Sequence, residues 1–297
     1  MAIPILHLWE KYFYDYHEGL GSTYERFIIN ELLVSIVNQF NIKTVFESPS
    51  FGFTGLSGIN SLGLAINGIN VTIADNNHTR LIKIREVWSQ FNTTANFILE
   101  NEANDLMIIK EYFNNLSNIN KKKNINHNFD MSWNFSALWF VKDIELFLNE
   151  LSNITTKAIL IIVPNRTGIG YLHQSQKGKN DLKNLLIEKN IVPDTFISIL
   201  KNLNWKLIKS DYIDCPLWPD IGMEKEDFLK TFITRKKKIT NRKRKNKKPL
   251  SIIDYYTGKS PNMKTKMLKL DFFEKFAPNV FKKIWAHHKY FLFVKGS

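Results

Sequence analysis

The residues best suited to binding or catalysis lie in one stretch, 44–77. Two acids, Glu47 and Asp75, flank a segment with three evenly spaced glycines, Gly52, Gly55 and Gly58. Glycines in a turn let backbone amides approach a bound molecule closely, and the start of a following helix adds unpaired N–H groups. An acid about 20 residues further on, at the tip of the next strand, can accept hydrogen bonds from both ribose hydroxyls. The pattern therefore indicates a site for an adenosine-containing cofactor. The alternative is an ordinary α/β turn that needs glycine for packing.

The flanking sequence predicts the strands and the helix that would position these residues. Residues 43–47 form a short β-branched and aromatic run that is typical of a strand. Residues 61–66 are compatible with a helix that Gly68 ends, and residues 71–74 form a second strand that stops at Asp75. This order of strand, glycine-rich turn, helix, strand and acid predicts one βαβ half-unit.

The stretch resembles two motifs of the class I S-adenosylmethionine-dependent methyltransferases. The first motif of that family is a strand closed by Glu or Asp, a glycine-rich turn, Ser or Thr, and Leu-Ala. Here Glu47 is followed by Gly58, Ser61 and a Leu-Ala pair. The strand VTIAD, residues 71–75, resembles the second motif. This chain departs from the family by about five additional residues, SPSFG, between the acid and the last glycine.

The resemblance implies a Rossmann-like α/β fold with a seven-stranded, mostly parallel sheet, an antiparallel last strand and helices on both faces. It also implies an enzyme that uses S-adenosyl-L-methionine as cofactor and transfers its methyl group to an acceptor. The residues expected to bind the cofactor are Glu47, Gly52, Gly55, Gly58 and Asp75. Further candidates are Asn76, Asn101 and Asn134, and Tyr24 is expected near the carboxylate of the cofactor. Two other hypotheses stay open: an NAD(P)-dependent oxidoreductase, and a non-catalytic binding protein on a degenerate methyltransferase scaffold.

The rest of the chain continues the alternation of helices and strands. Ser22 and Glu25 have capping-box spacing, which predicts that a helix begins after Ser22 and precedes the first strand. Further strands are expected at residues 95–100, 129–135, 158–163, 205–211 and 288–294. Further helices are expected at residues 78–91, 103–116, 141–151 and 267–287. Strands that alternate with helices predict a parallel sheet with right-handed crossovers.

Several polar residues could act as a base or orient the methyl acceptor. Asn134 has the best position, because it lies near the end of the fourth expected strand, whose tip faces the methyl group in the family. His17 and His173 are the other candidates, beside Glu18 and Asp130. The Asn-Pro-Pro-Tyr type of motif that marks amino-group methylation in the family does not occur at this strand, which disfavours adenine N6 or glutamine as the acceptor.

The formal net charge of +13 is concentrated in one segment. Residues 235–248 hold ten basic side chains, and the other residues carry 31 basic and 28 acidic side chains. This segment could bind an anionic partner, either nucleic acid or a membrane surface, or it could be a solvated loop. The near-neutral remainder and the aromatic N-terminal region favour a small-molecule or lipid-like acceptor over nucleic acid.

The sequence also carries indications about location. No stretch of 18 apolar residues occurs, so no transmembrane segment is expected. The first residues lack a basic segment before an apolar one and do not indicate a signal peptide. The single cysteine, Cys215, excludes an internal disulfide and fits a reducing, cytoplasmic compartment. The oligomeric state stays open.

Four segments are expected along the chain. They are an N-terminal helical cover at 1–40, a cofactor-binding core at 41–215, a basic insertion or lid at 216–286, and the final strand of the core sheet at 287–297. No metal site is expected, because no Cys, Asp or Glu at ligand spacing surrounds His287 and His288. Adjacent histidines that enter a strand also point to opposite faces.

Overall fold

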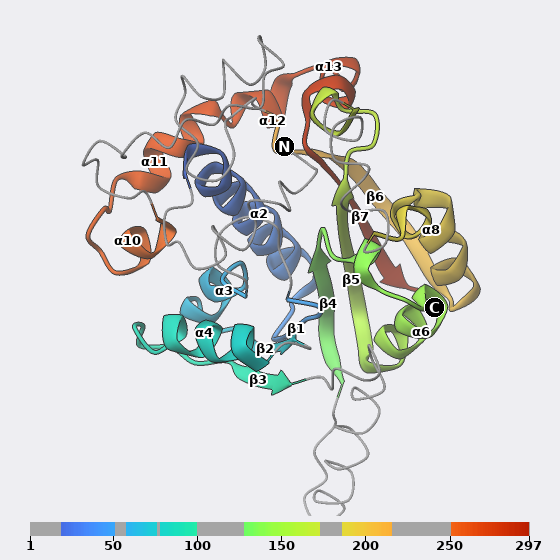
Figure 1. The fold of residues 1–297 in the computed structure, drawn as a ribbon, viewed down its shortest axis with the longest axis horizontal. Coiled ribbons are helices and arrows are strands. Elements are labelled where there is room, and N and C mark those ends of the chain that lie inside the picture. The colour runs from blue at the N-terminus through green and yellow to red at the C-terminus, as the bar shows by residue number, and fades with distance from the viewer. Residues whose placement is uncertain are drawn as a thin grey trace, which may run out of the picture.

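The computed structural model describes residues 19–50, 58–75, 78–99, 128–172, 186–215 and 251–296. These residues form a seven-stranded sheet with the order β3-β2-β1-β4-β5-β7-β6 (Figure 1). Neighbouring strands are parallel except at β7, which is antiparallel to both β5 and β6. The strands are β1 (Thr44–Glu47), β2 (Asn70–Asp75), β3 (Asn96–Leu99), β4 (Phe129–Phe135), β5 (Thr155–Pro164), β6 (Trp205–Ile213) and β7 (His288–Lys295). The expected mostly parallel sheet with an antiparallel last strand is confirmed.

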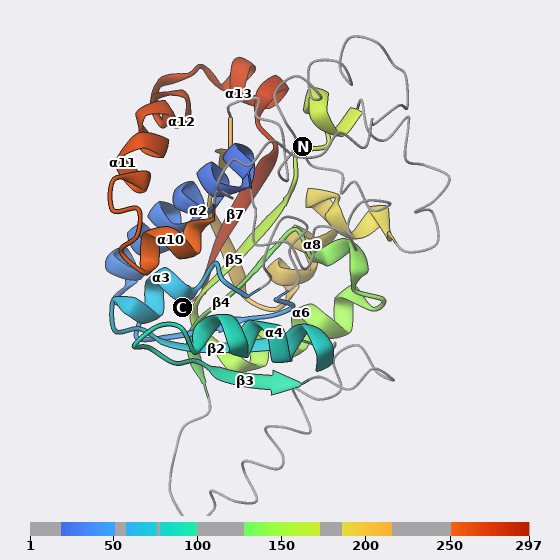
Figure 2. The ribbon, with the colours of Figure 1, turned by 60° about the vertical axis from the view of Figure 1, so that its left-hand side comes forward.

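Helices cover both faces of this sheet, as expected. The α-helices are α2 (Gly19–Phe40), α3 (Leu62–Ile66), α4 (His78–Trp88), α6 (Ile144–Ile154), α8 (Pro193–Asn202), α10 (Ile252–Tyr256), α11 (Met263–Met267), α12 (Phe272–Phe276) and α13 (Asn279–Trp285). Short 3-10 segments are η1 (Leu138–Phe140), η2 (Glu188–Ile191) and η3 (Leu268–Leu270). Helices α2, α3 and α10 to α12 lie on one side of the sheet, and α6 and α8 lie on the other (Figure 2).

Two apolar cores, one on each face, follow from the alternation of side chains along the strands. Strand β5 shows this most clearly, because residues 158–163 are buried throughout. Leu160 belongs to the core that contains Phe27 of α2, and Ile161 belongs to the core that contains Phe147 of α6. A continuous apolar run of this kind is expected for a strand covered on both faces.

Two helices differ from the sequence-based expectation. Helix α2 begins at Gly19, so Ser22 and Glu25 lie inside the helix instead of capping it, and both are buried. The single helix expected at 267–287 is instead a series of short helices that includes η3, α12 and α13. Pro278 separates the last two, because proline lacks a backbone N–H and disfavours helical backbone at the residue before it, which has ψ 138°.

Some expected elements lie outside the described residues. These are the helix at 103–116 and the basic segment at 235–248. The division of the chain into four segments stays a prediction. Among the described helices, none combines the length and the apolar character that a membrane crossing requires.

Candidate functional site

Several predicted site residues meet at one edge of the sheet, the carboxyl edge, where β1, β2, β4, β5 and β6 end and β7 begins. Glu47 ends β1, Asp75 ends β2, and Asn134 is the next-to-last residue of β4. The register places Glu47 beside Trp133, the residue before Asn134. After β1 the chain turns towards β2, because Ser50 N–H donates to the carbonyl of the penultimate residue of β2 at 3.0 Å. The three predicted residues therefore lie at neighbouring strand ends.

Glu47 is a buried carboxyl group in a short chain of hydrogen bonds. The Ser61 hydroxyl donates to its Oε2 at 2.5 Å and accepts the indole N–H of Trp133 at 3.1 Å. Burial raises the pKa of Glu47 to about 7, against the opposing effects of the Ser61 hydrogen bond and the Arg26 charge. Because a nearby positive charge lowers such a pKa, a cationic ligand at this edge would meet an ionised carboxylate.

Asp75 is fully buried and is held by an arginine that sequence reasoning missed. Arg80, near the start of α4, donates Nη2 to Oδ1 and Nε to Oδ2, both at 2.6 Å. The Ser50 hydroxyl also donates to Oδ2. The ion pair is buried from both sides, with side chains 7% and 0% exposed for Arg80 and Asp75. A ribose could bind this carboxylate only by replacing some of these hydrogen bonds.

Gly58 is required by the local backbone and packing. Its φ is +67°, and a Cβ at this position would lie 2.8 Å from the side chain of Ile84 in α4. Its carbonyl accepts the indole N–H of Trp88 at 3.0 Å. These contacts explain the glycine without a ligand, so the cofactor role of Gly58 stays a prediction.

Asn134 has the clearest unmet hydrogen-bonding capacity at this edge. Its side chain is 0% exposed, yet neither Nδ2 nor Oδ1 has a hydrogen-bond partner within the described part of the chain. The buried hydroxyl of Ser136, two residues later, is also unpartnered there. An amide offers two donors and one acceptor, and burying it unpaired is unfavourable by roughly 1 to 3 kcal/mol. A ligand with both donors and acceptors would complement this position.

Tyr24 contacts the C-terminal helices. Its hydroxyl donates to Glu274 Oε1 of α12 at 3.1 Å and lies 3.4 Å from the carbonyl oxygen of Leu270. Burial, reinforced by the charge of Glu274, raises the pKa of Tyr24 above its usual range. Glu274 also accepts the backbone N–H of Cys215 at 2.7 Å, and burial raises its own pKa to about 7. Tyr24 thus joins α2 to α12, and contact with a cofactor carboxylate stays a prediction.

A second buried polar group, the acid–histidine cluster, consists of Glu25, Asp214, His287 and His288. His287 Nδ1 lies 2.8 Å from Asp214 Oδ2, and His288 Nδ1 lies 3.3 Å from Glu25 Oε2. None of the four residues is more than 5% exposed. Burial raises the pKa of Asp214 to about 7 and lowers the pKa of both histidines well below their usual value. Sequence reasoning missed this cluster because its acids are far from the histidines along the chain.

Comparison with known proteins places this arrangement in a known fold. No protein-family model and no curated protein sequence matches the chain. Among solved structures it is similar to the plantazolicin methyltransferase BamL in complex with a triazolic desmethylPZN analog and SAH. That match has a TM-score of 0.50 and 13% identity and covers 93% of this chain and 86% of that one. The chain has the class I methyltransferase fold.

Two further structures have lower scores. The plantazolicin methyltransferase BpumL, in complex with the same kind of analog and SAH, matches with a TM-score of 0.48 and 12% identity over 92% of this chain and 86% of that one. The magnesium protoporphyrin IX methyltransferase ChlM from Synechocystis PCC 6803, with bound SAH, matches with a TM-score of 0.46 and 9% identity over 65% of this chain and 78% of that one.

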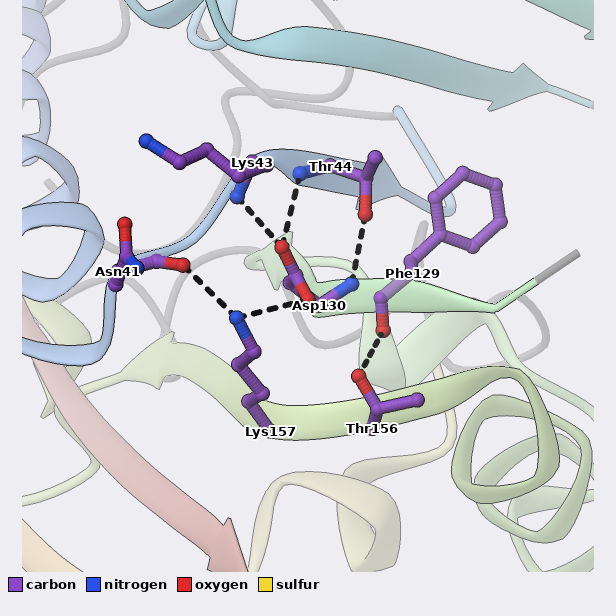
Figure 3. A network of polar contacts seen from close by, with 7 residues as sticks. All are labelled: Asn41, Lys43, Thr44, Phe129, Asp130, Thr156 and Lys157. Carbon is purple, nitrogen blue, oxygen red and sulfur yellow. Dashed lines mark hydrogen bonds and ion pairs between the residues drawn. The ribbon is translucent and has the colours of Figure 1, made fainter. Parts of the chain in front are cut away.

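Asp130 lies at the opposite end of the methyltransferase-fold sheet, the amino edge, where β1, β4 and β5 begin (Figure 3). Its Oδ2 accepts the backbone N–H groups of Lys43 at 2.6 Å and Thr44 at 3.3 Å. Its Oδ1 pairs with Lys157 Nζ at 3.1 Å. This position does not fit the suggested role as a base beside the methyl acceptor.

The remaining predicted site residues lie outside the described part of the chain. These are the candidate catalytic residues His17 and His173 and the candidate cofactor residues Gly52, Gly55, Asn76 and Asn101. Their roles stay predictions.

Proposed function

We propose that this chain binds S-adenosylmethionine at the carboxyl edge and transfers its methyl group to a small-molecule or lipid-like acceptor. The observation that carries the proposal is the buried, unpartnered amide of Asn134 at the same edge as Glu47 and Asp75. Polar groups buried inside proteins are otherwise nearly always hydrogen-bonded, so an orphan amide at the ligand-binding edge of an α/β sheet indicates a ligand.

Each residue at this edge has a proposed part in holding the cofactor. Glu47, ionised in the presence of a cation, would attract the positively charged cofactor, and Asp75 would accept hydrogen bonds from its ribose hydroxyls. Asn134 would hold polar atoms of the cofactor or orient the acceptor. The proposed cofactor residues that await a direct test are Gly52, Gly55, Gly58, Asn76, Asn101 and Tyr24.

The chemistry divides between the cofactor and the chain. When bound, the cofactor supplies a methyl group activated by its sulfonium, and the acceptor nucleophile displaces it in line. The chain's own residues orient the acceptor and exclude water from the reacting atoms. The Asn134 amide can fix an acceptor oxygen or nitrogen through a hydrogen bond, which makes it the proposed positioning residue.

The acceptor class is inferred from two observations. Outside residues 235–248 the chain is almost neutral, which does not favour an acceptor with many phosphates. The BamL structure is a complex with a triazolic desmethylPZN analog and SAH, so this fold can hold a compound of that kind. Both support a small organic acceptor over nucleic acid.

A second candidate function is ligand binding without methyl transfer, on a degenerate methyltransferase scaffold. The observation that favours it is the Asp75–Arg80 ion pair, because it occupies the carboxylate expected to bind the ribose. A chain that kept this pair intact would lose the ribose contacts and with them much of the cofactor affinity.

The test that separates the two is calorimetric titration of the full chain with S-adenosylmethionine and with S-adenosylhomocysteine, with NADH as the control. The proposed function predicts micromolar affinity for either adenosyl ligand and no affinity for NADH. Binding of NADH alone would favour an oxidoreductase, and binding of none of the three would favour the degenerate scaffold. Methyl transfer is then assayed with small aromatic and lipid-like acceptors, and RNA serves as the competing class.

The basic segment 235–248 is proposed to attach the protein to an anionic partner. Ten positive charges in 14 residues provide a strong and salt-dependent attraction to phosphate. Deletion of the segment should abolish retention on heparin and on vesicles that contain anionic lipid. If the parent chain is retained on heparin but not on the vesicles, the partner is nucleic acid. If the deletion variant is retained on both supports as strongly as the parent, the segment does not attach the protein.

A further inference from the structure

The acid–histidine cluster joins three parts of the fold at the carboxyl edge. Glu25 comes from α2, Asp214 directly follows β6, and His288 is the first residue of β7. The His288 ring packs against Phe135, the last residue of β4, with centroids 4.7 Å apart. The cluster therefore lies beside the strand that carries Asn134, and it belongs to none of the contacts assigned above to the cofactor.

The geometry of the cluster could accommodate a metal ion. Glu25, Asp214 and His288 each offer one ligand atom, and these atoms all lie within 4.8 Å of one another. Two ligand atoms bound about 2.1 Å from one tetrahedral ion lie about 3.4 Å apart. Closing the site around an ion thus requires ligand atoms to approach one another by up to about 1.4 Å.

Two of the potential ligand residues, Asp214 and His288, have unmet hydrogen-bonding capacity among the described residues. Asp214 Oδ1 and His288 Nδ1 are buried and have no hydrogen-bond partner among the described residues. A buried carboxylate such as that of Asp214 is unfavourable unless it is paired or binds a metal. The buried amine of Lys282 lies 3.5 Å from Asp211 Oδ2.

We propose that Glu25, Asp214 and His288 bind a divalent transition-metal ion, with Zn²⁺ as the best match. Two carboxylates and one imidazole are among the ligand sets that Zn²⁺ accepts, and three protein ligands leave a fourth position open. His287, whose Nδ1 lies 2.8 Å from Asp214 Oδ2, is a positioning residue that orients the carboxylate. The proposal is independent of the proposed methyl transfer, because its test measures metal and not activity.

The first experiment titrates Zn²⁺ into the full chain after removal of metal by a chelator. Calorimetry should show one ion per chain, and the melting temperature should rise by several degrees, because a ligand that binds only the folded state stabilises it. His288→Gln and Asp214→Asn should each lose at least 100-fold in affinity. His78→Gln, which changes an exposed imidazole on α4, is the matched control and should bind Zn²⁺ as the parent does.

His287→Gln distinguishes a ligand from the residue that orients it. Loss of such an orienting partner typically weakens metal binding 10- to 100-fold and leaves the number of bound ions unchanged. Failure of the parent chain to bind Zn²⁺, or equal binding by the parent, His288→Gln and Asp214→Asn, would overturn the proposal.

Cobalt substitution tests the donor set without any variant. Co²⁺ bound by two carboxylates and an imidazole should give visible d–d absorption bands without a sulfur-to-metal charge-transfer band. A charge-transfer band would identify Cys215 as a ligand and contradict the proposed site. Addition of Zn²⁺ should abolish the cobalt spectrum, and a spectrum that persists would show that the two ions occupy different sites.

Discussion

The two edges of the sheet differ in whether their polar side chains find hydrogen-bond partners among the described residues of the protein. At the amino edge, Asp130 and its neighbours satisfy one another with protein groups alone (Figure 3). Thr44 Oγ1 accepts the Asp130 N–H at 2.9 Å, and Lys157 Nζ reaches the carbonyl of Asn41 at 2.8 Å. These contacts join the starts of three adjacent strands, which is sufficient reason for polar side chains there.

At the carboxyl edge, buried polar atoms lack protein partners within the described part of the chain. They include both amide atoms of Asn134, the Ser136 hydroxyl, Asp214 Oδ1 and His288 Nδ1. Burial raises the pKa of Glu47 and of Asp214 to about 7 at the same edge. The strands are continuous from one edge to the other, so the difference does not come from the sheet itself.

A fold satisfies its buried polar groups wherever stability alone decides, and departures from this rule concentrate at functional sites. The amino edge is therefore structural, and the unpartnered atoms at the carboxyl edge support the proposed ligand site there. Four substitutions can break or sharpen this contrast.

The largest effect is expected for Asp75→Ala at the carboxyl edge. This change removes the carboxylate that pairs with the buried Arg80 guanidinium, which should lower the free energy of unfolding by about 3 to 5 kcal/mol. Urea unfolding followed by tryptophan fluorescence measures it.

A double substitution separates stability from binding at this position. Asp75→Asn combined with Arg80→Gln removes both charges and should recover most of the lost stability. Its affinity for S-adenosylmethionine should stay low if Asp75 binds the ribose. Parent-like affinity in the double variant would show that the ribose lies elsewhere.

The next largest effect is expected for Glu47→Gln, which changes how the free energy of unfolding depends on pH. Its pKa of about 7 in the folded state lies above its ordinary value of 4.5. Its stabilising contribution is thus fully present below pH 4.5 and is lost as the pH rises through 7, by up to roughly 3 kcal/mol. Glu47→Gln should match the parent at pH 4.5 and exceed its free energy of unfolding at pH 8.

The measurement is urea unfolding of both proteins between pH 4.5 and 8. Asp214 and Glu274 titrate in both proteins, so the difference between the two curves isolates Glu47. Curves that run parallel over this range would show that burial does not shift the pKa of Glu47.

A smaller effect of opposite sign is expected for Asn134→Leu. Replacing an unpartnered buried amide by an apolar side chain of similar size should raise the free energy of unfolding of the ligand-free chain by about 1 to 2 kcal/mol. The same change should weaken S-adenosylmethionine binding or methyl transfer at least 10-fold. The matched control is Asn190→Leu, because Asn190 Nδ2 donates to two backbone carbonyls, one at 2.6 Å. The Asn190→Leu variant should lose stability and keep its ligand affinity. If both variants change stability and ligand affinity alike, Asn134 has no special role in binding a ligand.

Local patterns in the sequence were sufficient for much of the fold. Strand β4 has the expected bounds, 129–135. Glu47 and Asp75 were placed at neighbouring strand ends because strand, turn, helix and strand follow one another within about 30 residues, so their spacing fixes their geometry. The expectation of a single helix at 267–287 was wrong for an equally local reason, because Pro278 interrupts the helical backbone.

Contacts between distant parts of the chain could not be read in this way. The acid–histidine cluster joins Glu25 to Asp214 and His288, and no spacing rule connects residues that α2, β6 and β7 bring together. Their packing creates the proposed site, and spacing along the sequence around the histidines carries no information about it. The Asp75–Arg80 pair is intermediate, because the two residues are close in sequence and only the turn into α4 makes them face each other.

The smallest effect is expected at the amino edge, for Asp130→Ala. The carboxylate accepts two backbone N–H groups, but its side chain is 18% exposed and that of its partner Lys157 is 39% exposed, so water can replace much of what is lost. The free energy of unfolding should fall by about 1 kcal/mol. Affinities for S-adenosylmethionine and Zn²⁺ should equal those of the parent, because no ligand completes this edge. Asp130→Asn keeps an acceptor oxygen and should fall between Asp130→Ala and the parent in stability. Loss of either ligand from a folded Asp130→Ala chain would contradict the division of the sheet into a structural edge and a ligand-binding edge.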